Sequence, residues 1–193
     1  MQNRHITAEE LLRDSFELGA RVIESGFRPK WLAAIWRGGA PVGIAVHELL
    51  QHCGICADYF AIGTSSYRGM GKRGGAVEVR GLGEVARRVR ATDAMLIVDD
   101  IYDTGLSVAA LLDELQSRAG DNTPRDIRIA APWFKPCNNR TRRAPDYHIH
   151  QTADWLVFPH EVRGLPPAEI AQNKPTLAPI LHRLTPYTVP ERE

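Results

Sequence analysis

Hydrophobic and polar residues along the chain form two kinds of pattern, one typical of helices and one typical of buried strands. A capping box at residues 7–10 begins an amphipathic helix that continues to Gly26. The apolar positions of this helix are Leu12, Phe16, Gly19 and Ile23. Short, nearly continuous apolar runs follow at 30–36, 55–62 and 94–98. Such runs suit parallel strands that are covered on both faces.

The rest of the chain continues these patterns. Helices are predicted at 41–52 and 107–120, and a further strand at 126–134. Shorter strand-like pieces lie at 146–150 and 155–158. Strands that alternate with helices imply an α/β fold, with a parallel sheet covered by helices on both faces. Ligands of such folds bind at the carboxyl ends of the strands, in the loops that lead to helices.

The composition narrows the classes of function. The 193 residues are 44% hydrophobic and 24% charged, as in an ordinary globular protein that builds its core without disulfides or metals. A formal net charge of +1 gives no reason to expect nucleic acid or an acidic membrane as a partner. No signal peptide core and no apolar run of membrane-spanning length is apparent. We therefore expect a cytoplasmic protein without a membrane partner.

The three cysteines give little sign of metal or redox chemistry. Cys53 and Cys56 form one C-x-x-C pair, and Cys137 stands alone. A zinc site normally needs a second pair or histidines at suitable spacing. We expect a helix that ends near Cys53, with Gly54 as its C-terminal stop and Cys56 inside the next strand.

The stretch "AMLIVDDIYDTGLSV" (94–108) holds the strongest chemical signal. Asp99 and Asp100 end a buried strand, where carboxylates are costly unless cations, hydroxyls or amides satisfy them. Two such carboxylates can accept hydrogen bonds from the vicinal hydroxyls of a sugar, directly or through a metal ion.

The residues that follow form a phosphate-binding pattern. A turn followed by a helix N-terminus can offer several backbone N–H groups to an anion. The residues that would form this turn are Asp103, Thr104, Gly105, Leu106 and Ser107. An acidic N-cap on an ordinary loop would explain Asp103 or Ser107, but not the pair of carboxylates before them. A sugar diol site beside a phosphate cradle indicates a ribose 5-phosphate site.

"MLIVDDIYDTGLS" closely resembles the phosphoribosyl pyrophosphate (PRPP) motif of the type I phosphoribosyltransferases, and the acid at Asp103 resembles the 6-oxopurine branch. Tyr102 departs from the family, in which an aliphatic residue is usual. The resemblance implies a Rossmann-like α/β fold with a small hood for base recognition. It implies a transferase domain over 1–161, with hood pieces near the N-terminus and at about 133–161, followed by a proline-rich extension, 162–193.

Further segments resemble the same family and imply further roles. "WRGG" resembles the pyrophosphate-binding loop and assigns that role to Arg37, Gly38 and Gly39. The glycine-rich loop resembles the mobile loop that covers the reaction, with Ser66, Tyr67 and Arg68. The base would be bound by Lys135 at its 6-oxo group, by stacking on Trp155 and by the backbone of Leu156. The magnesium ligands would be Asp99 and Asp100, with Glu161 near a second ion.

The resemblance implies transfer of phosphoribosyl from PRPP to hypoxanthine, guanine or xanthine, with Mg²⁺ as cofactor and Asp103 exchanging a proton with purine N7. It also implies a homodimer or homotetramer. Three related classes of enzyme fit less well. Adenine and orotate phosphoribosyltransferases usually have a small or hydroxyl-bearing residue at the position of Asp103, and PRPP synthetases have a longer chain. A non-catalytic PRPP-sensing regulator on the same fold stays open, because arginines cluster at Arg87, Arg88, Arg90, Arg140, Arg142 and Arg143.

Overall fold

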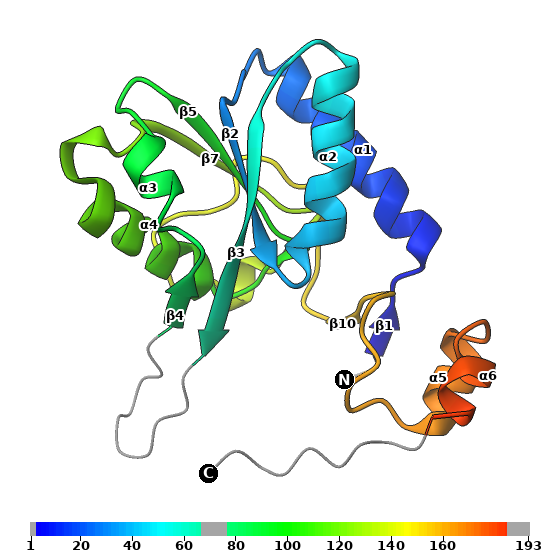
Figure 1. Ribbon diagram of the computed structural model, residues 1–193. Coiled ribbons are helices and arrows are strands. Elements are labelled where there is room, and N and C mark those ends of the chain that lie inside the picture. The colour runs from blue at the N-terminus through cyan, green and yellow to red at the C-terminus, as the bar shows by residue number, and fades with distance from the viewer. Residues whose placement is uncertain (1–2, 67–76, 185–193) are drawn as a thin grey trace, which may run out of the picture.

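A five-stranded sheet forms the centre of the computed structural model, which describes residues 3–66 and 77–184 (Figure 1). The strands follow the spatial order β4–β3–β2–β5–β7; all neighbours are parallel except β4, which runs antiparallel to β3. They span β2 (Trp31–Trp36), β3 (Asp58–Ser66), β4 (Val77–Arg80), β5 (Ala94–Val98) and β7 (Asp126–Ala130). The predicted α/β fold with a mostly parallel sheet is confirmed.

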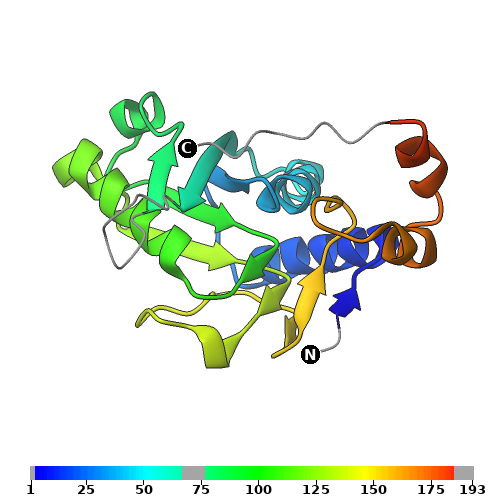
Figure 2. The same ribbon diagram turned by 90° about the horizontal axis from the view of Figure 1, so that it is seen from below.

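Helices cover both faces of this sheet (Figures 1 and 2). One face carries α1 (Ala8–Glu24) and α2 (Gly39–His52), and the other carries α3 (Val85–Arg88) and α4 (Leu106–Ala119). Alternate residues of β2 enter different clusters: Leu32 packs in the cluster beneath α1 and α2, whereas Ile35 packs in the cluster beneath α3 and α4. Because side chains alternate between the two faces of a strand, one apolar run contributes to both hydrophobic cores.

The first helix begins as predicted, but its buried face differs in part from the predicted one. The Glu10 amide donates to Thr7 Oγ1 at 3.1 Å, which is the N-terminal half of a capping box. Leu12 and Phe16, expected on the buried face, are exposed. Of the predicted positions, Gly19 is buried and Ile23 packs partly buried against the core. The other buried residues of the helix are Leu11, Asp14, Ser15, Leu18 and Val22.

Two smaller sheets lie beyond the carboxyl ends of the central strands. One joins β6 (Ile101–Tyr102), β8 (Trp133–Phe134) and β9 (His150–Gln151); a short 3-10 turn, Pro136–Asn138, follows β8. The single strand predicted at 126–134 is therefore wrong, because it divides into β7 and β8. Pro132 lies between them and has no backbone N–H, and its carbonyl instead accepts from Ile149 and His150.

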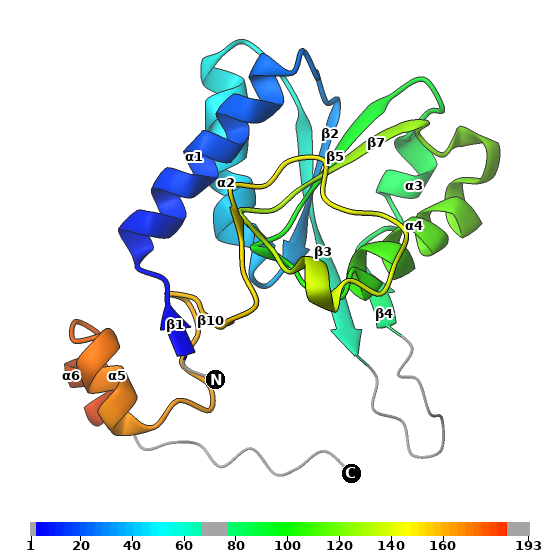
Figure 3. The same cartoon turned by 180° about the vertical axis from the view of Figure 1, so that it is seen from behind.

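The second small sheet joins the beginning of the chain to its last third. β1 (Asn3–His5) pairs in parallel with β10 (Trp155–Val157). Two short helices follow, α5 (Pro167–Asn173) and α6 (Ala178–His182), and Figure 3 shows them beside β1 and β10. In the part of the chain that the structure describes, no helix is both long and apolar enough to cross a membrane.

The cysteine-containing segment follows the prediction only in part. Helix α2 ends at His52, and Gly54 has φ +76°, the left-handed conformation that glycine tolerates after a helix. Cys56, predicted inside the next strand, instead precedes it, because β3 begins at Asp58. Cys53, Cys56 and Cys137 are exposed free thiols.

Candidate active site

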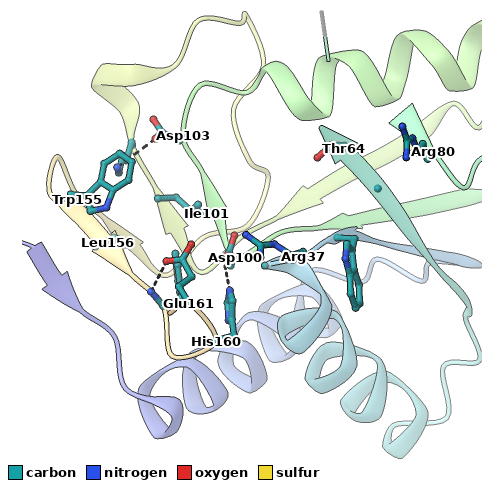
Figure 4. Close-up of a pocket in the computed structure, with 15 residues that line it drawn as sticks. Arg37, Thr64, Arg80, Asp100, Ile101, Asp103, Trp155, Leu156, His160 and Glu161 are labelled. Carbon is teal, nitrogen blue, oxygen red and sulfur yellow. Dashed lines mark hydrogen bonds and ion pairs between the residues drawn. The ribbon is translucent and has the colours of Figure 1, made fainter. Parts of the chain in front are cut away.

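A cavity of about 620 Å³ opens at the carboxyl ends of the central strands, as expected for this fold (Figure 4). In that view Trp155 and Asp103 lie at one end, Asp100 and Arg37 in the middle, and Arg80 at the other end. The remaining wall residues are Trp36, Gly38, Gly63, Thr64, Ile101, Lys135, Leu156, Phe158, His160 and Glu161.

The loop after β2 lies directly against the loop after β5. A Cβ placed on Gly38 would collide with the carboxylate of Asp100, and one on Gly39 would lie 2.9 Å from the Cα of Asp99. The peptide bond between Trp36 and Arg37 is cis. The two glycines predicted to bind pyrophosphate are thus required by close approach to the acidic pair.

The two acids, Asp99 and Asp100, lie in different environments. Asp99 Oδ1 accepts the backbone N–H of Asp100 at 3.0 Å, and burial, together with the neighbouring Asp100 carboxylate, raises the pKa of Asp99. Asp100 is buried but lines the cavity, and His160 Nε2 lies 3.4 Å from its Oδ2. The strand end therefore holds negative charge for which a bound cation or hydroxyl would be a suitable partner.

These oxygen ligands fit a magnesium ion, which prefers carboxylates and substrate oxygens. The described residues contain no cluster of three or more His, Cys, Asp or Glu side chains that could hold a metal alone. Glu161 lines the same cavity, but its Oε2 accepts the backbone N–H of Phe158 at 3.0 Å. Asp100 would thus need ligands from a substrate to complete a magnesium site, whereas Asp99, predicted as a second ligand, does not line the cavity.

The predicted phosphate turn is a tight bend that enters α4. Gly105 has φ +76° and precedes the first helical residue, Leu106, whose N–H faces Thr104 Oγ1 at 3.4 Å. Thr104, Gly105, Leu106 and Ser107 lie in this turn, beside the cavity wall rather than on it. The amides at the start of a 14-residue helix make this turn a suitable anion site.

Tyr102, the departure from the family pattern, is buried behind this turn. Its hydroxyl donates to the carbonyl of Arg143 at 3.0 Å and lies 3.1 Å from Thr141 Oγ1. The Arg140 N–H also donates to the carbonyl of Thr104 at 3.0 Å. The segment 140–143 therefore supports the phosphate turn from behind.

Two of the residues predicted to contact the base meet near Asp103. The Lys135 side chain is only 5% exposed; its Nζ lies 3.5 Å from Asp103 Oδ2 and 5.3 Å from the ring centroid of Trp155. Asn138 Nδ2 donates to Asp103 Oδ1 at 2.9 Å, so both oxygens of the acid have partners. Trp155 is 60% exposed and presents a free aromatic surface, while Leu156 is buried beside it.

Several wall residues had no signal in the sequence. His160, Thr64 and Arg80 reach the cavity only through the fold, although His160 directly precedes the predicted Glu161. Of the predicted mobile-loop residues, Ser66 ends β3, and Tyr67 and Arg68 lie outside the described residues. Asp99 and Gly39 lie behind the cavity wall, where they pack against each other.

Solved structures with this architecture include purine phosphoribosyltransferases. The enzyme from Pyrococcus horikoshii Ot3 is 25% identical with a TM-score of 0.64, and the alignment covers 86% of this chain and 98% of that one. A hypothetical protein from Neisseria gonorrhoeae with bound ppGpp is 18% identical with a TM-score of 0.71, covering 91% and 97%. The xanthine-guanine-hypoxanthine phosphoribosyltransferase of Helicobacter pylori is 24% identical with a TM-score of 0.61, covering 83% and 95%.

The last two similarities concern the fold alone, because their identity is below 25%. No curated protein matches the chain. The model of the phosphoribosyl transferase domain, however, matches residues 6–165, which include every described wall residue of the cavity. The chain therefore belongs to the phosphoribosyltransferase family.

Proposed function

We propose that this protein transfers the 5-phosphoribosyl group of PRPP to a 6-oxopurine base, giving a nucleoside monophosphate and pyrophosphate. The observation that carries the proposal is the meeting of Lys135, Asp103 and Trp155 at one end of a cavity whose middle holds Asp100, one of the two acids predicted to bind PRPP. A cation, an acid and an exposed aromatic surface match the 6-oxo group, the imidazole edge and the face of such a base.

The reaction forms a bond between a purine nitrogen and ribose C1 and breaks the bond from C1 to pyrophosphate, whose oxygen takes the electron pair. Asp103 would accept the proton that the purine loses, at N7. Arg37 and the backbone beside Gly38 would stabilise the negative charge of the leaving pyrophosphate. Asp100 would orient the ribose hydroxyls.

Magnesium, held by Asp100 together with substrate oxygens, would supply further neutralisation of the pyrophosphate charge. The residue that separates 6-oxopurines from 6-aminopurines is Lys135. Its ammonium donates to an oxo group but has no lone pair to accept a hydrogen bond from an amine. A 6-aminopurine would leave its amine unpaired in this part of the pocket and would therefore bind more weakly.

The first test is pyrophosphate release from magnesium PRPP with hypoxanthine, guanine, xanthine, adenine or orotate as acceptor. We expect turnover with at least one 6-oxopurine and a loss of about 100-fold or more in Asp103→Asn, the scale of general acid–base catalysis. Asp113→Asn is the matched control, because Asp113 is an exposed acid in α4, outside the cavity. Turnover with adenine or orotate alone, or full activity of Asp103→Asn, would contradict the proposal.

A second candidate is a regulator that binds PRPP or a related nucleotide without turnover. The observation behind it is that a protein of the same fold, the hypothetical protein from Neisseria gonorrhoeae, carries bound ppGpp, so the fold is compatible with such a ligand. Its expected interaction surface, the arginine clusters, is partly engaged within the chain: Arg88 pairs with Asp58 and Glu84, and Arg143 donates to the carbonyl of Ile127. Measurable binding of PRPP with no turnover of any base would select this function.

A further inference from the structure

Helix α5 contacts the first strand of the chain through an acidic side chain. Glu169 Oε1 accepts from Asn3 Nδ2 at 2.9 Å and lies 2.8 Å from His5 Nε2. Both partners belong to β1, and hydrogen bonds from them lower the pKa of Glu169. Helix α5 is thereby attached to β1, the strand that pairs with β10.

Lys174, at the end of the same helix, reaches the segment that follows β10. Its side chain is buried, with the whole residue 7% exposed, and Nζ donates to the carbonyls of Phe158 at 2.6 Å and Pro159 at 3.2 Å. Burial lowers the pKa of Lys174, while the charge of Glu161 raises it. A buried ammonium is costly, so its position here is specified by these carbonyl partners.

These contacts hold both strands of one small sheet. In its register Asn3 faces Trp155 and Arg4 faces Leu156, the residues proposed to bind the base. An isolated two-stranded sheet is only marginally stable, so the position of β10 depends on what packs around it. Figure 3 shows α5 beside this pair of strands, away from the central sheet.

We propose that α5 braces the base-binding strand β10, and that Lys174 and Glu169 are positioning residues for recognition of the purine. The inference rests on the proposed function and gives α5 and Lys174 an indirect role in binding the acceptor base. Neither side chain is on the cavity wall. They act through the backbone after β10 and through β1, and small displacements of a binding group reduce its contribution steeply.

The test compares Lys174→Met, which keeps the apolar stem but removes the ammonium, with Asn173→Ala. Asn173 is the matched control, because among the described residues its side chain donates only to the Glu169 carbonyl of its own helix. We expect Lys174→Met to raise KM for the base at least tenfold while KM for PRPP stays within twofold. Asn173→Ala should leave both constants within twofold. Lys174→Arg, whose guanidinium can donate to both carbonyls, should restore most of the affinity for the base.

Hydrogen exchange makes the brace testable apart from turnover. Amides of residues 155–158 should exchange at least tenfold faster in Lys174→Met than in the unchanged chain, with β5 unaffected. Equal exchange in the two proteins, or a parallel rise of both KM values, would overturn the brace. If the unchanged chain turns over no base, the proposed function fails, and the exchange result still decides whether α5 holds β10.

Discussion

Substitution of Gly105 by alanine tests the geometry of the phosphate turn. Gly105 has φ +76°, a conformation that costs an L-residue about 1–2 kcal/mol. Its new Cβ would also lie 2.6 Å from the Tyr102 hydroxyl and 2.8 Å from Thr141 Oγ1. Forcing atoms into such a packed position typically costs about 1–3 kcal/mol. We therefore expect Gly105→Ala to lower the free energy of unfolding by about 2–5 kcal/mol.

The Tyr102→Phe variant separates the two causes. It removes the hydroxyl, at a cost of about 1 kcal/mol, because the Arg143 carbonyl keeps the side chains of Asn139 and Thr141 as donors. In the double variant the Cβ at position 105 no longer meets this hydroxyl, although the ring carbon that bore it would still lie 2.9 Å away. The double variant should then be less destabilised than the sum of the single variants by about 1 kcal/mol.

Urea unfolding of the four proteins measures these differences through the midpoints, provided that the slopes agree. The unchanged chain, both single variants and the double variant complete the cycle. Additivity within about 0.5 kcal/mol would refute the contact between position 105 and the Tyr102 hydroxyl. A Gly105→Ala variant as stable as the unchanged chain would refute the strained geometry of the turn itself.

Two more substitutions test other contacts. Gly38→Ala should displace the carboxylate of Asp100 and reduce kcat/KM for PRPP by about 100-fold. Gly83→Ala is the control and should keep full activity, because its Cβ would meet only the end of a side chain, at 3.8 Å. Equal activities of the two variants would contradict this prediction. Burial raises the pKa of Asp93, but hydrogen bonds from the side chains of Trp31 and Lys30 and the amide of residue 90 outweigh it and leave that pKa lowered. Asp93 thus stabilises the fold above the carboxyl pKa of the unfolded chain, about 3.9, and this contribution is lost as the pH falls through the lower, folded-state pKa. Asp93→Asn should cost about 1–3 kcal/mol in urea unfolding at pH 7 and less at pH 3; an equal loss at both would contradict it.

The middle of the central sheet was predictable because β2 and β5 are contiguous apolar runs. The run at 94–98 coincides with β5, and the run at 30–36 contains β2. Periodicity alone was less decisive for α1, where apolar residues lie on two adjacent stripes. The packing against α2 decides between them: Leu18 and Val22 are fully buried, whereas Leu12 is exposed.

The edges of the fold depend on contacts that no local pattern contains. β1 is a polar segment, Asn3–His5, and forms a strand only because β10 pairs with it from the other end of the chain. The PRPP motif could be proposed from the sequence because its residues are contiguous, from Asp99 to Ser107. Lys174 resembles any surface lysine in the sequence, and only the packing of α5 shows it to be buried.

The two ends of the cavity have separate supports, which is why we expect the brace to change acceptor affinity alone. Asp100 follows the central strand β5, is buried, and is held against Gly38. Its contact with His160, at 3.4 Å, is to a partly exposed side chain, so a shift of that loop leaves the carboxylate in place. Trp155 and Leu156 depend instead on β1 and α5. A fold built in this way can change its acceptor end while the donor end stays intact, which accords with the use of one fold for many substrates.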